Sequence, residues 1–211
     1  MNLPNSLTVT RIFLVPLLVV VLLTKFEGRV ILGVPKEIVG AVIFAIASLT
    51  DWADGYVARR RKQITPLGQV IDPLADKLLI SAALLSLVQM DLAPAWMVWV
   101  ILGREFAVQT LRSLAYARGV AMPASPLGKV KMVAQVVAIL ALILAHGPGV
   151  GLHGAAPWSP LFLLGQAALW IVVATALVSA AAYFRRFNTI VSPRIADFNA
   201  ALEQRSDRKA G

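Results

Sequence analysis

Four aspartates, Asp51, Asp54, Asp72 and Asp76, stand close together in one short stretch of the chain. On a helix, with about 100° of rotation per residue, Asp51 and Asp54 lie about 60° apart and the other two about 40° apart, so each pair shares a face. The loop from Arg59 to Pro66 is short enough to make two such helices antiparallel neighbours. The sequence therefore predicts a cluster of four carboxylates where these helices meet.

Such a cluster indicates a site for a hard divalent cation. Carboxylate oxygens with no histidine or cysteine beside them suit Mg²⁺ or Mn²⁺ better than zinc or copper. Because Mg²⁺ held by a few carboxylates keeps coordination positions open for phosphate oxygens, a substrate that contains a pyrophosphate is indicated. By helical spacing, Gly55, Ala58 and Gly68 fall near the carboxylate face and leave room for a base or ribose, and Arg59 has the charge to neutralise a diphosphate.

The composition indicates that these helices belong to an integral membrane protein. Of 211 residues, 58% are hydrophobic and 15% are charged, against roughly 45–50% and 25% in soluble domains. The net charge of +9 then indicates cytoplasmic loops and anionic lipid headgroups rather than nucleic acid. The chain has no cysteine, which excludes disulfides and thiolate metal sites. We expect no cleaved signal peptide, because a basic segment before the first apolar run and a cleavage site after it are missing.

Six hydrophobic runs predict an all-α fold of six transmembrane helices. The runs are Leu7 to Thr24, Glu37 to Thr50, Val70 to Met90, Ala93 to Ala117, Val130 to Ala145 and Leu161 to Phe184. The second run reaches the ~20 residues of a span only if it continues through Asp51 and Asp54 to about Arg59. We expect one membrane domain over residues 1–187, followed by a polar cytoplasmic tail over residues 188–211.

Lysines and arginines orient the spans, because cytoplasmic loops collect them. With both termini inside, the outer loops keep only Lys25, Arg29 and Lys36. Both termini and the carboxylate cluster are therefore expected on the cytoplasmic side. Arg11, four residues into an apolar segment, is expected to extend toward the headgroups.

The carboxylate stretch follows the pattern D-x2-D-G-x2-A-R-x8-G-x3-D-x3-D, with eight fixed positions from Asp51 to Asp76. This pattern resembles the signature of the CDP-alcohol phosphotransferase family, whose members are six-helix membrane enzymes, usually homodimers, that displace CMP from a CDP-linked donor with an alcohol. The resemblance implies two Mg²⁺ or Mn²⁺ ions held by Asp51, Asp54, Asp72 and Asp76. It also implies that Asp76 is the general base, and that Gly55, Ala58 and Arg59 line the CDP pocket.

Two further blocks resemble the branch of this family that uses glycerol 3-phosphate. The opening block, Asn2 to Arg11, implies that Asn5 and Thr8 help to frame the nucleotide site, although helix capping explains both residues as well. The second block comprises Gly103-Arg104-Glu105, Leu111-Arg112, Gly128-Lys129-Val130-Lys131 and Gln135, with Met132 where that branch usually has threonine.

Four basic residues of the second block, Arg104, Arg112, Lys129 and Lys131, are expected to bind the phosphate of the acceptor. An intramembrane Arg104–Glu105 ion pair, or charges that only orient the spans, would also account for them. The resemblance implies CDP-diacylglycerol and sn-glycerol 3-phosphate as substrates, at the bacterial cell membrane with the site facing the cytoplasm. An inositol 1-phosphate acceptor stays open. So do a small cation-coupled carrier and a purely structural network of acids.

Overall fold

The computed structural model of the chain describes residues 3–24, 30–31, 33–61, 66–117, 126–147, 159–182 and 185. Within these segments, residues 3–9, 30, 51–61, 66–73, 76, 114–117 and 126–129 are described by their backbone alone. The expected domain boundary after residue 187 and the expected polar tail lie outside the described residues.

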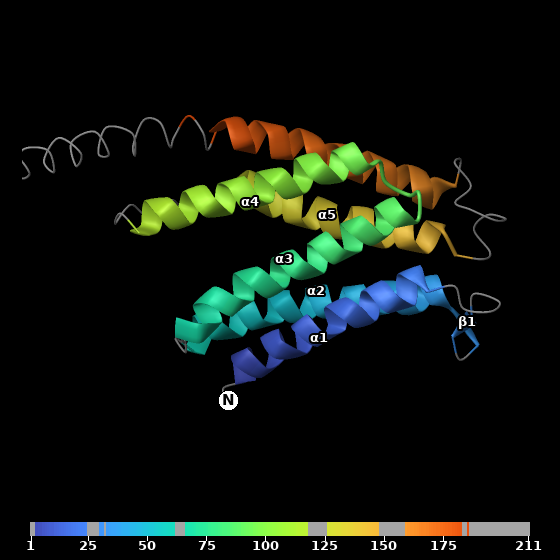
Figure 1. The fold of residues 1–211 in the computed structure, drawn as a ribbon, viewed down its shortest axis with the longest axis horizontal. Helices are drawn as coiled ribbons and strands as arrows, with labels where there is room; N and C mark the ends of the chain where they lie inside the picture. Colours follow the sequence, from blue (N-terminus) through green and yellow to red (C-terminus); the bar gives the residue numbers. More distant parts are fainter. Residues whose placement is uncertain are drawn as a thin grey trace, which may run out of the picture.

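Six long helices make up most of the described part, which confirms the all-α class (Figure 1). They are α1 (Leu3–Leu23), α2 (Lys36–Arg61), α3 (Pro66–Gln89), α4 (Ala95–Ala117), α5 (Pro126–Ala145) and a further helix, Pro160–Ala182. Each of them covers one of the six hydrophobic runs. The α2 helix continues past Thr50, as the number of residues needed for a membrane span predicted. Asp51 and Asp54 are therefore helical.

A short hairpin between α1 and α2 is an addition that the sequence did not predict. Strands β1 (Val30–Ile31) and β2 (Val34–Pro35) pair antiparallel, with Ile31 opposite Val34. Gly33, in the turn between them, has a φ of +82°, a left-handed conformation that glycine adopts without steric cost. The chain therefore reverses tightly before α2 begins.

Successive helices run in opposite directions (Figure 1). We call the end of the bundle where α2 finishes at Arg61 and α3 begins at Pro66 the aspartate end, and the end where α2 begins at Lys36 the hairpin end. The amino ends of α1 and α5 and the carboxyl end of α4 also lie at the aspartate end. This alternation brings segments that are far apart in sequence to the same end of the bundle.

The core runs through all six helices. The α1 helix packs against α2 and α3, and α2 packs against α5. Fully buried members include Leu18 of α1, Phe44 of α2, Leu84 of α3, Ile139 of α5 and Leu169 of the helix Pro160–Ala182. Close packing of these side chains holds the helices together through van der Waals contacts.

Gly40 lets α1 and α2 approach each other closely. A β-carbon at residue 40 would lie 2.5 Å from Cδ2 of Leu22, well inside the contact distance of two carbon atoms. A larger residue at this position would therefore require the Leu22 side chain to move and would change how α1 packs against α2.

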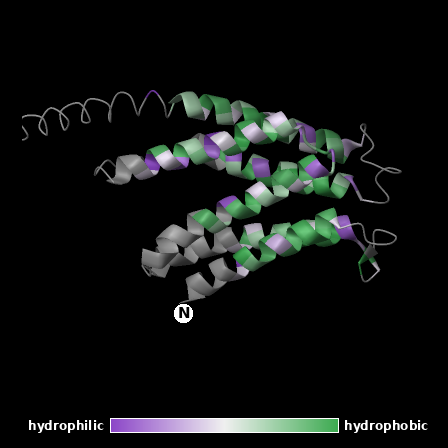
Figure 2. Ribbon diagram, viewed as in Figure 1, coloured by the Kyte–Doolittle hydropathy of each residue, from purple (hydrophilic) through white to green (hydrophobic). Residues whose placement is uncertain are grey.

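The outer surface of the bundle is apolar. Figure 2 shows hydrophobic residues along most of the described length of the helices, with hydrophilic residues at few positions. Trp99 is 78% exposed and Phe13 is 71% exposed, and large apolar side chains are also exposed on the other helices: Leu49, Leu85, Val133 and Val178. By length and composition alone, one helix in the described part, Pro160–Ala182, is apolar and long enough to cross a membrane.

Candidate functional site

The four aspartates lie on two neighbouring helices near the same end of the bundle. Asp51 and Asp54 belong to α2, and Asp72 and Asp76 belong to α3. The two helices are antiparallel and in contact, as the short loop between them predicted. Convergence of the four carboxylates stays a prediction, because these side chains lie outside what the structure describes.

The donor set at this end fits a hard cation. Both helix segments supply carboxylates, and no histidine or cysteine occurs between Ser48 and Leu79. Oxygen ligands of this kind are those of Mg²⁺ and Mn²⁺.

The residues predicted to line a nucleotide pocket are distributed over the three helices that meet here. Asn5 and Thr8 lie on α1, Gly55, Ala58 and Arg59 on α2, and Gly68 on α3. Because α1 packs against both α2 and α3, these helices bring the three groups to one end of the bundle. Their side chains are also outside the described part of the chain.

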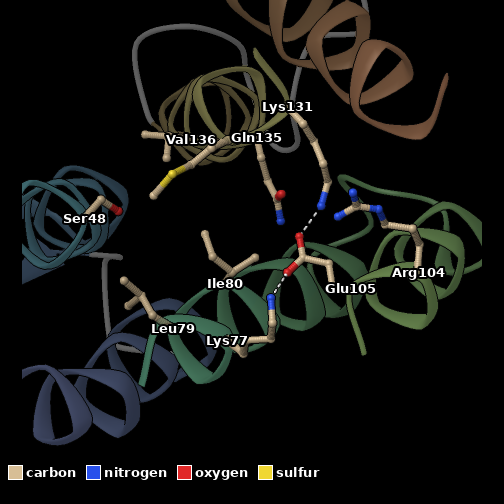
Figure 3. Close-up of a pocket in the computed structure, with 10 residues that line it drawn as sticks. Ser48, Lys77, Leu79, Ile80, Arg104, Glu105, Lys131, Gln135 and Val136 are labelled. Carbon is tan, nitrogen blue, oxygen red and sulfur yellow. Dashed lines mark hydrogen bonds and ion pairs between the residues drawn. The ribbon is translucent and has the colours of Figure 1, made fainter. Parts of the chain in front are cut away.

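A cavity of about 170 Å³ lies between α2, α3, α4 and α5 (Figure 3). A cavity of this size has room for a small polar molecule. Apolar side chains from α3 and α5 form part of its wall. The polar and charged residues that line it are Ser48, Lys77, Arg104, Glu105, Lys131 and Gln135.

Glu105 joins two lysines across this cavity. Lys77 Nζ lies 2.7 Å from Glu105 Oε2, and Lys131 Nζ donates to Glu105 Oε1. The side chains are 19%, 11% and 5% exposed for Lys77, Glu105 and Lys131. A buried ion without a partner costs several kcal/mol, and the one carboxylate gives each ammonium group a partner while the three residues keep an excess of positive charge. We call these three residues, one each from α3, α4 and α5, the Glu105 bridge.

Arg104 is held at the cavity by the helix Pro160–Ala182. Its Nε donates to Ser179 Oγ at 2.9 Å, and the Ser179 hydroxyl donates to the carbonyl oxygen of Ala176 at 3.1 Å. Ser179 is only 3% exposed, so a buried hydroxyl fixes the guanidinium beside the Glu105 bridge. The cavity therefore gathers three cationic side chains around one carboxylate, an arrangement that attracts an anion.

The predicted acceptor residues divide into two groups. Arg104 and Lys131 line the cavity. Arg112 lies about two turns closer to the aspartate end of α4 and is not part of the cavity wall. Lys129 is in the first turn of α5, and its side chain is not described.

Sequence reasoning gave no binding role to Ser48, Lys77 and Gln135, all of which line the cavity. Each had a spacing signal: Ser48 comes one turn before Asp51, Lys77 follows Asp76, and Gln135 comes one turn after Lys131. The expectation for Arg11 is wrong. Its side chain is 2% exposed and is packed inside the bundle, so it does not extend to the surface.

Comparison with known proteins decides the family. Residues 1–178 match the CDP-alcohol phosphatidyltransferase family. The chain belongs to this family. The resemblance drawn from the eight fixed positions between Asp51 and Asp76 is thereby confirmed.

Individual relatives in the CDP-alcohol phosphatidyltransferase family cover most of the chain. A CDP-diacylglycerol–glycerol-3-phosphate 3-phosphatidyltransferase of Bacillus subtilis is 45% identical over 190 residues, which are 88% of this chain and 94% of the relative. A protein of the same name from Rickettsia felis is 35% identical over 87% of this chain and 94% of its own length. A probable phosphatidylglycerophosphate synthase of Mycobacterium tuberculosis is 42% identical over 74% of this chain and 71% of its own length.

Proposed function

We propose that the chain transfers the phosphatidyl group of CDP-diacylglycerol to sn-glycerol 3-phosphate, giving phosphatidylglycerol phosphate and CMP. The observation that carries this proposal is the cationic cavity beside the aspartate-bearing helices. Lys77 of the cavity wall directly follows Asp76, and Ser48 comes one turn before Asp51. An anionic alcohol in the cavity would therefore lie next to the segments that carry the catalytic signature. Relatives at 35–45% identity carry the name of this reaction.

The cations of the cavity suit a phosphorylated acceptor. Arg104 and Lys131 bind the acceptor phosphate through charge-assisted hydrogen bonds, and the Glu105 bridge keeps Lys131 in place. Arg112 and Lys129 lie closer to the aspartate end on α4 and α5, where they attract the phosphate as it enters. An acceptor without a phosphate would form no charge-assisted hydrogen bonds with these four side chains.

The donor occupies the aspartate end. Asp51, Asp54 and Asp72 hold two Mg²⁺ or Mn²⁺ ions, and Asp76 completes the second site. When bound, these ions neutralise the oxygens of the diphosphate and stabilise the charge on the leaving CMP. Residues from three helices line the pocket for the cytidine nucleotide: Asn5, Thr8, Gly55, Ala58, Arg59 and Gly68.

The reaction is a single displacement in which Asp76 takes a proton. The acceptor hydroxyl oxygen forms a bond to the phosphorus that carries diacylglycerol, and the bond from that phosphorus to the CMP oxygen breaks. The hydroxyl proton passes to the Asp76 carboxylate. General-base assistance of this kind accelerates a reaction about 10²- to 10⁴-fold.

The bundle is placed in the bacterial cell membrane with six spans, both termini in the cytoplasm and the aspartate end facing the cytoplasm. The alternating helix directions and the large apolar side chains exposed on all six helices support this placement. The family resemblance further favours a homodimer.

Release of CMP by the purified protein tests the reaction. The full chain in detergent micelles is incubated with CDP-diacylglycerol, Mg²⁺ or Mn²⁺, and one acceptor at a time: sn-glycerol 3-phosphate, inositol 1-phosphate, inositol or serine. We expect CMP and phosphatidylglycerol phosphate with glycerol 3-phosphate, and loss of both products when a chelator removes the divalent ions.

Two outcomes would contradict the proposal in different ways. CMP release with inositol 1-phosphate but not with glycerol 3-phosphate would assign the chain to the inositol-phosphate branch. Cation-coupled transport by protein in vesicles, without CMP release under any condition, would make the aspartates an ion site of a carrier.

A further inference from the structure

The proposed reaction leaves one buried polar group of the cavity without a role, the amide of Gln135. Gln135 is 3% exposed and lines the cavity, and its side chain points from α5 toward the Glu105 carboxylate (Figure 3). Among the described residues its Nε2 has no hydrogen-bond partner. Leaving a buried donor unpaired costs about 1–3 kcal/mol. An oxygen of the molecule that fills the cavity would remove this cost.

The chemistry of the amide differs from that of its charged neighbours. Lysine and arginine only donate hydrogen bonds, which suits a phosphate, whereas an amide offers a donor and an acceptor side by side. A hydroxyl group has the same two capacities, so an alcohol is the natural partner for Gln135. Ser48 supplies a second neutral group, and its buried Oγ also has no partner in the described part. The wall of the cavity thus combines charged and neutral polar groups, as a phosphorylated alcohol does.

The order of residues along the helices indicates which hydroxyl Gln135 would meet. The reacting hydroxyl has to lie toward Asp76, the proposed base, and the phosphate toward Arg104 and Lys131. The middle hydroxyl is on the carbon next to the one that carries the phosphate, so it is the hydroxyl nearest to Lys131. Gln135 is one turn from Lys131 on the same face of α5, on the side away from the aspartate end. Its amide therefore neighbours the phosphate site, where the middle hydroxyl is the hydroxyl within reach.

We propose that Gln135 is a specificity-determining residue that hydrogen-bonds the middle, non-reacting hydroxyl of sn-glycerol 3-phosphate. The identity of this acceptor rests on the proposed function. Through its amide, the cavity distinguishes acceptors that carry a hydroxyl at the middle carbon from those that do not. A site that pairs a substrate hydroxyl discriminates strongly against an analogue without it, because its own polar group is then left unpaired.

The test compares sn-glycerol 3-phosphate with 3-hydroxypropyl phosphate, which lacks only the middle hydroxyl. The affinity of each ligand for the purified full chain is measured by calorimetry, with no donor present and hence without turnover. We expect the wild-type protein to bind glycerol 3-phosphate about 10-fold more tightly than the analogue. In Gln135→Leu the two affinities should become equal, mainly through weaker binding of glycerol 3-phosphate.

Gln166→Leu is the matched control. Gln166 is also a helical glutamine, but its Nε2 donates to the carbonyl oxygen of Leu92 at 2.7 Å, and it does not line the cavity. This variant should keep the wild-type affinity ratio. Three results would overturn the assignment: an unchanged ratio in Gln135→Leu, equal binding of both ligands by the wild type, or a ratio lost in Ser48→Ala while Gln135→Leu keeps it.

The failure of this inference differs from failure of the proposed function. If the wild type releases no CMP with any acceptor, the transferase proposal fails, whereas the affinity ratio still decides the role of Gln135. Failure of the wild type to bind either phosphate would overturn the assignment of Gln135, whereas CMP release would still decide the reaction.

Discussion

Two regions of this bundle, the Glu105 bridge and the hairpin end, bury charged side chains and use them differently. In the Glu105 bridge, each oxygen of the carboxylate accepts a hydrogen bond from a lysine of another helix. At the hairpin end, Lys36 donates to the carbonyl oxygens of Leu22 at 3.0 Å and Thr24 at 3.2 Å. These carbonyls belong to the end of α1, where a helix leaves its last acceptors unpaired.

The difference shows that a buried charge does not by itself mark a binding site. Lys36 completes the hydrogen bonds of a helix end, and adjacent Glu37 is fully buried, with no hydrogen-bond partner for either carboxylate oxygen among the described residues. Neither residue lines the cavity between α2, α3, α4 and α5. The Glu105 bridge instead borders this cavity, which is large enough for a small ligand. We therefore expect substitutions in the cavity to change catalysis and substitutions at the hairpin end to change stability alone.

The largest effect is expected for Asp76→Asn, next to Lys77 of the bridge. Turnover should fall about 10²- to 10⁴-fold because the proposed base is lost, while CDP-diacylglycerol binding stays near the wild-type level. CMP release and binding of labelled donor measure the two quantities. Asp91→Asn is the matched control, because Asp91 lies in the α3–α4 turn with a φ of 57°, which asparagine also adopts. An active Asp76→Asn variant would remove Asp76 as the base.

Glu105→Gln should reduce both stability and acceptor use. It leaves two ammonium groups with no carboxylate between them, and removing one partner of a buried ion pair costs about 3–5 kcal/mol. Denaturation of the protein in detergent measures the stability, and the KM for glycerol 3-phosphate measures acceptor binding.

A triple variant separates the two contributions of the bridge. Replacing Lys77 and Lys131 by methionine and Glu105 by leucine removes all three charges together, which often restores stability. We expect a protein about as stable as the wild type that uses glycerol 3-phosphate poorly. A triple variant with normal acceptor kinetics would show that the bridge is only structural.

Lys36→Met should lower stability by about 1.5–3 kcal/mol, the range for hydrogen bonds to a charged group. The affected carbonyls are at the hairpin end, so the KM for the acceptor should stay unchanged. Melting temperature and steady-state kinetics on the same preparation check both statements. A changed acceptor KM with a normal melting temperature would contradict the division between the two regions.

The smallest effect is expected for Glu37→Gln. The change removes a buried charge for which the described residues offer no hydrogen bond, and it also removes a first-turn acid that the helix dipole favours by about 0.3–1 kcal/mol. These effects oppose each other, and the amide that replaces the carboxylate is also left unpaired, at a cost of about 1–3 kcal/mol. The gain from removing the charge is therefore largely offset, and stability should change by no more than about 1 kcal/mol. A loss of several kcal/mol in the same denaturation assay would mean that Glu37 is paired as firmly as Glu105.

The helices could be predicted from the sequence because each depends on its own residues. The hydrophobic runs gave all six, and the length of a span required α2 to continue through Asp51 and Asp54. The hairpin was missed because strands as short as Val30–Ile31 and Val34–Pro35 depend on each other rather than on a periodic pattern.

The cavity could be predicted only in part. The second block of the resemblance identified Arg104 and Lys131, but it did not reveal that Glu105 pairs with lysines from two other helices. Those contacts depend on how α3, α4 and α5 are rotated about their axes, which is a property of packing. Lys77 lies outside that block, and its one signal in the sequence is that it follows Asp76.

The close approach at Gly40 has a consequence for the far end of the molecule. Helices are stiff rods, so a tilt where α1 and α2 touch is amplified with distance along them. Arg59 lies about 28 Å from Gly40 along α2 at 1.5 Å per residue, and a tilt of about 5° moves it by about 2.5 Å. The width of the proposed nucleotide pocket therefore depends on packing at the opposite end of α2, at Gly40, where glycine has a hydrogen atom in place of the methyl group of alanine.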